Sequence, residues 1–195
     1  MDAKRITNRD FFTQPAEELA PALLGKIICH KISEEKIIRF RLIESEAYPH
    51  NDTACHANKY KTGNAVITQN MIGGTLYVHY DNKEYPGSSF DIVSNKENCG
   101  EGVLIRGGIN IDDPSEMYGS APRLLGEALK IDYKRLNRMD LCDLEQTQVW
   151  LEEDGFVTDN KILPPKKRIG LNDAKDICDA DKNRLLRFVL DTRKL

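Results

Sequence analysis

The stretch Ile37-Ile38-Arg39-Phe40-Arg41-Leu42-Ile43-Glu44-Ser45-Glu46 decides the fold class of this chain. Its β-branched and aromatic residues are typical of a strand, and a strand presents alternate residues on opposite faces. Unbroken alternation predicts that Glu44 and Glu46 share a face with Phe40 and Leu42, so that Glu46 emerges at the rim of the core. Desolvation there would raise the pKa of its carboxyl group, as in many general acids and bases.

Further strand and helix patterns surround this stretch. Short apolar or alternating runs bounded by turn residues predict strands, and apolar residues at helical spacing predict helices. The predicted strands are residues 27–30, 37–46, 74–80, 89–94, 103–109, 148–152, 168–171 and 187–190, and the predicted helices are 15–24 and 120–131. Strands outnumber helices and adjacent strands are close enough to form hairpins, so we expect an α+β fold with an antiparallel sheet. With no repeat or linker in view, residues 1–195 are interpreted as a single domain.

The composition indicates a globular protein. The chain has 195 residues, 40% hydrophobic and 30% charged, with a formal net charge of −3. This charge argues against nucleic-acid binding by bulk electrostatics, although local patches such as Lys166-Lys167-Arg168 remain open. No apolar run is long enough for a membrane span, and the polar start shows no secretory signal. We therefore expect a cytoplasmic or nuclear protein that is neither secreted nor membrane-bound.

Metal binding is the first chemistry to weigh. The five cysteines are scattered without a C-x-x-C pair, so we expect reduced thiols. His50, Asp52, Cys55 and His56 lie close together, but their spacing matches no established zinc pattern. We expect no metal here, and we expect Asp52 to cap a short helix that presents His56.

A carboxylate surrounded by aromatic rings is the stronger pattern. Glu46, Tyr48, His56, Tyr77 and His79 would line one pocket if their segments are neighbours. Rings of this kind suit a planar π ligand such as a nucleobase. The alternative is ordinary packing, with Tyr77 as a half-buried sheet residue and each histidine satisfied by local partners.

A set of segments, in order along nearly the whole chain, points to a known family. These segments are residues 11–26, Ile43 to Tyr48 with Asp52 and Ala54-Cys55-His56, residues 74–78, 102–107, 121–132, 167–171 and 186–188. The run Glu44-Ser45-Glu46-Ala47-Tyr48 followed by Ala54-Cys55-His56 resembles the signature of the alkyladenine (3-methyladenine) DNA glycosylases. The resemblance implies a curved antiparallel sheet with flanking helices and a protruding β-hairpin.

Family membership would imply hydrolysis of the N-glycosidic bond of alkylated or deaminated purines in double-stranded DNA, as in base excision repair. Such an enzyme acts as a monomer, flips the damaged nucleotide out of the duplex and needs no cofactor. Carried over by motif, Glu46 would activate the attacking water, and Arg106 would hold the water, the nucleotide or Glu46 itself. The substrate-binding residues carried over are Tyr48, His56, Tyr77, His79 and Asp91.

The chain departs from the family pattern around the hairpin. His79 stands where family members usually have tyrosine, and Asp91 aligns with an asparagine of the base pocket. The hairpin tip is rebuilt, with Tyr80 and Tyr85 as candidates for the wedge that fills the gap left by a flipped base. Two alternatives therefore stay open: a lesion-binding protein without catalysis, and a glycosidase acting on free nucleosides or RNA.

Overall fold

The computed structural model describes residues 3–60, 62–80 and 88–195. The strands are β1 Lys4–Arg5, β2 Ile27–Lys31, β3 Ile37–Tyr48, β4 Leu76–Val78, β5 Phe90–Ser94, β6 Glu101–Asn110, β7 Met117–Tyr118, β8 Val149–Glu153 and β9 Arg187–Val189. The α-helices are α1 Ala16–Leu23, α2 His56–Lys59, α3 Asn64–Gln69, α4 Pro122–Ala128, α5 Tyr133–Leu136 and α6 Asp179–Lys182, with 3-10 helices at Arg9–Phe11 and Thr192–Lys194.

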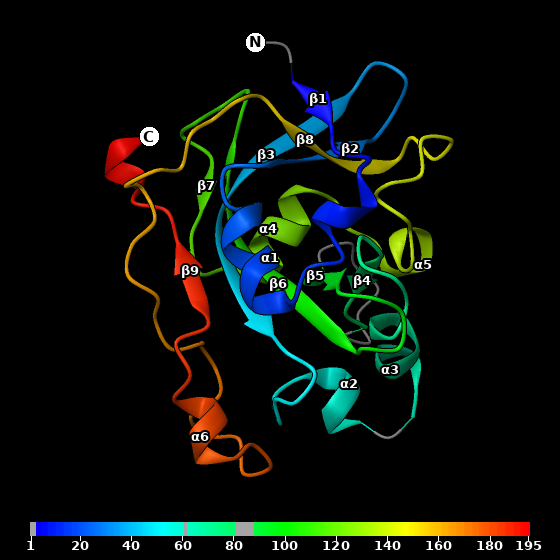
Figure 1. The fold of residues 1–195 in the computed structure, drawn as a ribbon. Helices are drawn as coiled ribbons and strands as arrows, with labels where there is room; N and C mark the ends of the chain where they lie inside the picture. The colour runs from blue at the N-terminus through cyan, green and yellow to red at the C-terminus, as the bar shows by residue number, and fades with distance from the viewer. Residues whose placement is uncertain (1–2, 61, 81–87) are drawn as a thin grey trace.

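All the strands of the described residues belong to one sheet (Figure 1). Its order is β1-β8-β2-β3-β6-β5-β4, with β7 beside β6 and β9 beside β3. Every pairing is antiparallel. The predicted α+β fold with an antiparallel sheet is therefore confirmed, while the extent of the domain stays a prediction.

Strand β3 organises the sheet because it pairs with three other strands. Its first half pairs with β2, and its second half pairs with β9 on the same edge. Along the other edge it pairs with β6 from Phe40 to Tyr48. Helices α1 and α4 pack on one face, where Leu19, Leu23 and Leu125 are fully buried in the main core. Burial of each such side chain contributes about 1.5–3 kcal/mol, so packing on this face stabilises the sheet.

The alternation of β3 is broken once. Phe40 and Leu42 lie in the main core, and so does Ala47. Ser45 lies on the same side, because its hydroxyl donates a 2.8 Å hydrogen bond to the carbonyl oxygen of Ala20 in α1. Core-facing positions thus change from even to odd numbers, and the pairing with β6 is irregular between Leu42 and Ser45.

This irregularity overturns one prediction. Glu44 and Glu46 do not share the face of Phe40 and Leu42 but lie on the opposite face of the sheet, away from α1. Bulges of this kind re-aim side chains and are frequent beside active sites. The glutamates therefore emerge into a polar region of the second face and not at the rim of the apolar core.

Most of the other predicted elements are present. The helix predicted at 15–24 is α1, and the hairpin strands pair as β4 and β5 with Tyr77 opposite Asp91. The hairpin tip, including the wedge candidate Tyr85, lies outside the described residues. Residues 168–171 are wrongly predicted as a strand, because the Ile169 amide bonds to a side chain and Gly170 has a φ of 82°. No helix in the described parts of the chain is long and apolar enough to cross a membrane.

Candidate active site

A row of paired residues crosses the sheet and builds the site. Glu46 in β3 lies opposite Leu104 in β6, Leu104 lies opposite Asp91 in β5, and Asp91 lies opposite Tyr77 in β4. Directly opposed residues of antiparallel strands share a face. Neighbouring strands are about 4.8 Å apart, so the Cα atoms of Glu46 and Asp91 are separated by roughly 10 Å. The sheet register alone therefore brings these four residues to one surface.

Glu46 is fully buried and accepts hydrogen bonds from three donors. Its Oε1 accepts from the Ile169 amide at 2.8 Å, and its Oε2 accepts from the Tyr48 hydroxyl at 3.0 Å and from Arg106 Nη1 at 3.1 Å. Burial raises the pKa of this carboxyl group, while Arg106 and the other donors pull it down. The result is an oriented carboxyl whose pKa stays above its ordinary value, which suits a general base.

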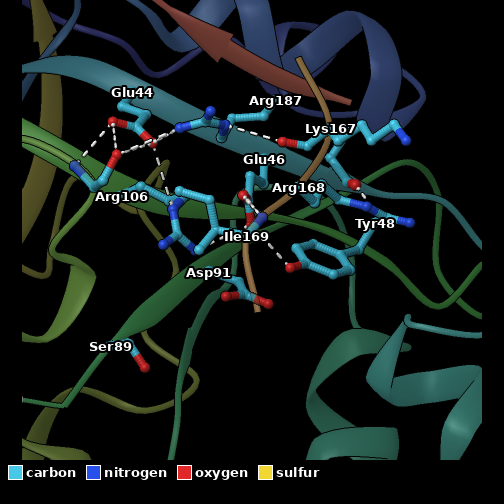
Figure 2. A network of polar contacts seen from close by, with 12 residues as sticks. Glu44, Glu46, Tyr48, Ser89, Asp91, Arg106, Lys167, Arg168, Ile169 and Arg187 are labelled. Carbon is cyan, nitrogen blue, oxygen red and sulfur yellow. Dashed lines mark hydrogen bonds and ion pairs between the residues drawn. The ribbon is translucent and has the colours of Figure 1, made fainter. Parts of the chain in front are cut away.

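Glu44 forms an ion pair with Arg106, the arginine that also bonds to Glu46 (Figure 2). Its carboxylate accepts 2.9 Å bonds from the Ser120 amide and hydroxyl and a 3.2 Å bond from Arg187 Nη1. Arg106 Nε lies 3.5 Å from Glu44 Oε1, so one buried guanidinium bridges the two glutamates. The positive charges of Arg106 and Arg187 thus compensate the negative charges of the two glutamates.

Tyr48 connects Glu46 to the pocket. Burial and the Glu46 charge raise its pKa well above the ordinary value, so it remains a neutral donor to that carboxylate. The guanidinium carbon of Arg168 lies 4.7 Å from the centroid of the Tyr48 ring. Arg168 is fixed in turn by a 3.0 Å bond to the Ala47 carbonyl oxygen and a 2.7 Å ion pair with Asp52. One face of the Tyr48 ring is therefore covered by a cation.

Asp52 does not cap a helix as predicted. Helix α2 begins at His56 with Cys55 at its N-cap, and no side chain caps it. Asp52 accepts a 2.8 Å bond from the Ala54 amide and forms a fully buried ion pair with Arg168. The long-range partner makes Asp52 part of the support of Tyr48, a role that local spacing does not reveal.

Three rings gather on the other side of the pocket. The ring centroid of His79 lies 4.8 Å from that of Tyr77 and 5.1 Å from that of His56. A 3.1 Å hydrogen bond joins His56 Nδ1 to the Tyr77 hydroxyl. Burial, with His79 nearby, lowers the pKa of His56, and burial raises that of Tyr77. Both side chains are therefore neutral hydrogen-bonding groups near pH 7.

Two of the departures from the family pattern, His79 and Asp91, contact each other. His79 Nε2 lies 2.8 Å from Asp91 Oδ1, and the Ser89 hydroxyl lies 3.1 Å from His79 Nδ1. Gln69 at the end of α3 donates to Asp91 Oδ2 at 3.4 Å. Gln69 and Ser89 could not be predicted as site residues, since neither stands in a motif and only the folded chain brings them here.

A pocket of about 140 Å³ opens between these groups. Its lining comprises Tyr48, Ala54, His56, Lys59, Gln69, His79, Asp91, Leu104, Gly170, Leu171, Ala174 and Ile177. A cavity of about 150 Å³ is known to hold a benzene ring, so this one accepts a single aromatic ring and its open side leaves room for more. Four of the five predicted substrate-binding residues line it. The fifth, Tyr77, is not in the lining but hydrogen-bonds to His56.

Other predicted features fall elsewhere. Tyr80 is 65% exposed, and its ring packs 5.0 Å from that of Tyr133 instead of facing the pocket. Among the residues that the structure describes, no three His, Cys, Asp or Glu side chains are placed to hold a metal ion.

Comparison with known proteins assigns the chain to a family. The sequence model described as "Methylpurine-DNA glycosylase (MPG)" matches residues 10–194. The chain belongs to the methylpurine-DNA glycosylase family. Methylpurine-DNA glycosylases are glycosyl hydrolases of DNA, so the resemblance noted in the sequence is confirmed at the level of the family.

Relatives of this family member align over nearly their full length. The chain is 32% identical to a protein of Borreliella burgdorferi named "Putative 3-methyladenine DNA glycosylase", covering 96% of this chain and 97% of the relative. It is 31% identical to a protein of the same name from Prosthecochloris aestuarii, covering 87% and 83%. Both alignments extend far beyond any single motif, so the likeness is not confined to the motifs.

Proposed function

We propose that this chain excises alkylated or deaminated purines from double-stranded DNA, with Glu46 activating the attacking water. The observation that carries the proposal is the burial of Glu46 beside an aromatic pocket, with three donors fixing its carboxylate. A buried carboxylate with a raised pKa can accept a proton close to neutral pH. The register that joins Glu46 to Leu104 and Asp91 ties this base to the pocket wall.

The proposed reaction needs one water molecule and no cofactor. The water oxygen bonds to the deoxyribose C1′ while the bond from C1′ to the purine nitrogen breaks, and its electron pair leaves with the purine. The water proton passes to Glu46. Positive charge develops on the sugar in such a transition state, so the Glu46 carboxylate also stabilises it electrostatically. Arg106 keeps that carboxylate ionised and oriented by bonding to Oε2.

The damaged base would enter the pocket after flipping out of the duplex. Unstacking costs about a few kcal/mol and less for a damaged pair, which favours lesions over normal bases. Tyr48 and His79 offer the ring faces for stacking, and His56 offers a hydrogen bond to the base edge. The wedge that replaces the flipped base is proposed to come from the hairpin, with Tyr80 and Tyr85 as candidates.

The test is excision from duplexes that each carry one lesion: hypoxanthine, 1,N6-ethenoadenine or 7-methylguanine. Abasic products are scored as alkali-labile sites under single-turnover conditions. Wild-type protein is expected to release at least one lesion, and Glu46→Gln should slow release by about 10²–10⁴-fold, the usual contribution of a general base. Failure to release any lesion, or release undiminished by Glu46→Gln, refutes the mechanism.

Glu101→Gln is the matched control. Glu101 is also buried, but it accepts a 2.9 Å bond from the Ala16 amide on the α1 side of the sheet. Its substitution changes a buried carboxylate without touching the pocket, so excision should persist. Lesion binding without excision would favour the non-catalytic alternative, and release from free nucleosides or RNA, but not from duplex DNA, would favour a different glycosidase.

A further inference from the structure

Asp91 places a carboxylate in the wall of the pocket. The residue is only 3% exposed, yet it lines the cavity together with His79 and Gln69. Its Oδ1 lies 2.8 Å from His79 Nε2, and its Oδ2 lies 3.4 Å from Gln69 Nε2. In the described parts of the chain, no arginine or lysine hydrogen-bonds to Asp91, in contrast to Glu44 and Glu46.

The polarity of this wall is fixed by its hydrogen bonds. An ionised carboxylate only accepts, so Nε2 of His79 carries the proton that faces Asp91. The amide of Gln69 is oriented by the 2.6 Å bond from the Ala57 amide to Oε1, which turns its NH₂ group toward Asp91. The remaining lone pairs of Asp91 Oδ2 can be satisfied only by donors or cations.

Lys59 beside the pocket and Arg168 over the Tyr48 ring are each paired with another aspartate, and among the described residues His79 is the one ionisable side chain that bonds to Asp91. The ammonium of Lys59 also lines the cavity, but it lies 2.9 Å from Asp176 in an ion pair. The pKa of His56 is lowered by burial, so its imidazole is neutral near pH 7 and does not repel a cation. The rings of Tyr48 and His79 present π faces, which attract positive charge when it is desolvated.

We infer that Asp91 makes this pocket selective for purines that carry a positive charge and an exocyclic amino group, against neutral purines that lack the amino group. The inference rests on the proposed function and names its substrate class. Alkylation of a ring nitrogen, as in 7-methylguanine or 3-methyladenine, leaves the amino group intact and makes the nucleoside cationic. Hypoxanthine has a carbonyl group instead, and the amino nitrogen of ethenoadenine is closed into a ring.

The experiment compares two lesions within one protein. Single-turnover rate constants are measured for 7-methylguanine and hypoxanthine duplexes with wild type and Asp91→Asn. The cationic nucleoside is intrinsically more labile, but this factor is the same for both proteins. It therefore cancels when the ratio of the two rate constants is compared between them. The ratio of 7-methylguanine to hypoxanthine release should fall by about 10- to 100-fold in Asp91→Asn, as for a lost hydrogen bond to a charged group. An unchanged ratio overturns the inference.

Control variants separate charge from shape. Asp91→Ser removes the same charge in a smaller side chain and should lower the ratio in the same direction, which guards against misfolding of Asp91→Asn. Asp154→Asn makes the same chemical change at an aspartate paired with Arg41 at 2.7 Å, outside the pocket, and should leave the ratio unchanged. A fall of equal size in Asp154→Asn would contradict a specific role for Asp91.

A binding measurement keeps this inference separable from the proposed function. Glu46→Gln protein, with and without Asp91→Asn, is titrated with the 7-methylguanine, hypoxanthine and undamaged duplexes at one salt concentration. Tighter binding of the 7-methylguanine duplex that is lost with Asp91→Asn supports the inference, even if wild type releases no base and the proposed function fails. Equal binding of both lesion duplexes refutes it, even if excision by wild type is normal.

Discussion

The two carboxylates in the residue row that crosses the sheet, Glu46 and Asp91, differ in how they are held. Glu46 accepts from Arg106, Tyr48 and the Ile169 amide, and Arg106 is shared with Glu44. Asp91, about two strands away, accepts from His79 and Gln69. Both carboxylates are buried on the same face, but only the first has arginine partners among the described residues.

This difference indicates that the two carboxylates have different roles. Burying a charge is costly unless it is paired, and Arg106 meets that requirement at Glu46. Asp91 has His79 and Gln69 as its partners among the described residues and no arginine, so we infer that a cationic ligand adds to its charge compensation. We therefore expect changes at Glu46 to alter the rate of excision on every lesion, and changes at Asp91 to alter the choice among lesions.

The largest effect is expected from Glu46→Gln. Loss of the proposed general base should slow excision by about 10²–10⁴-fold for every lesion that wild type accepts. Because this substitution leaves Asp91 and His79 in place, the ratio of rates between lesions should stay the same. Single-turnover kinetics on two lesions measure both quantities. A ratio that shifts with Glu46→Gln would contradict the separate roles of Glu46 in rate and Asp91 in the choice among lesions.

Arg106→Gln should leave Glu46, like Asp91, without an arginine partner. Removing one partner of a buried ion pair costs about 3–5 kcal/mol, so the free energy of unfolding should fall in denaturant titrations. Arg106 also lowers the pKa of Glu46, so its removal should raise that pKa and move the acid limb of the pH–rate profile to higher pH.

The control for this prediction is Arg193→Gln. The Arg193 side chain is 84% exposed in its pair with Asp191, and exposed pairs contribute about 1 kcal/mol or less. Similar losses of stability in the two variants would show that the Glu44–Arg106–Glu46 bridge is not a buried ion pair in solution.

A smaller effect concerns His56 and pH. Its pKa in the folded protein lies below the ordinary 6.5, so the unfolded chain binds more protons in mild acid. The His56 contribution to stability is therefore present above about pH 6.5 and is lost as the pH falls toward the folded-state pKa. His56→Gln should reduce the loss of stability between neutral and mildly acidic pH, as measured by denaturant titrations at two pH values. An unaltered pH dependence would contradict the neutral state assigned to His56.

The smallest effect is expected from Ser89→Ala. The Ser89 hydroxyl steadies His79 through Nδ1, so its loss should loosen the ring that bonds to Asp91. The lesion ratio should move in the same direction as in Asp91→Asn but by only a few-fold, as for one neutral hydrogen bond. Ser115→Ala, at an exposed serine bonded to Asp113, is the matched control and should not change the ratio.

Much of the fold could be predicted because its signals are local. The apolar spacing of α1 and the alternation in the first half of β3 reflect a helix and a strand with one buried face. The short helix presenting His56 was predicted and is α2, although Asp52 does not cap it, whereas α3, α5, α6, β1 and β7 were not predicted. None of them is long enough to show a period, and their conformation depends on the strands and loops around them.

The site was predictable in its residue types but not in its connections. Glu46, Tyr48 and His56 stand in one motif and do lie near one pocket. Arg168 and Ile169 reach this motif from more than a hundred residues away, through bonds to the Ala47 carbonyl oxygen and the Glu46 carboxylate. Contacts over such separations leave no periodic trace in a single sequence.

The sequence by itself determined that a carboxylate ends the long strand and that histidine and aspartate stand at two altered pocket positions. The tertiary structure decided which face that carboxylate occupies, because the irregular pairing of β3 with β6 breaks an alternation that the sequence presents as continuous. It also decided that His79 and Asp91 act on each other, since pairing of β4 with β5 sets Tyr77 opposite Asp91 and brings His79 within hydrogen-bonding distance. The sequence gives the type of each side chain directly, but the burial and pairing of charges depend on neighbours that only the folded chain provides.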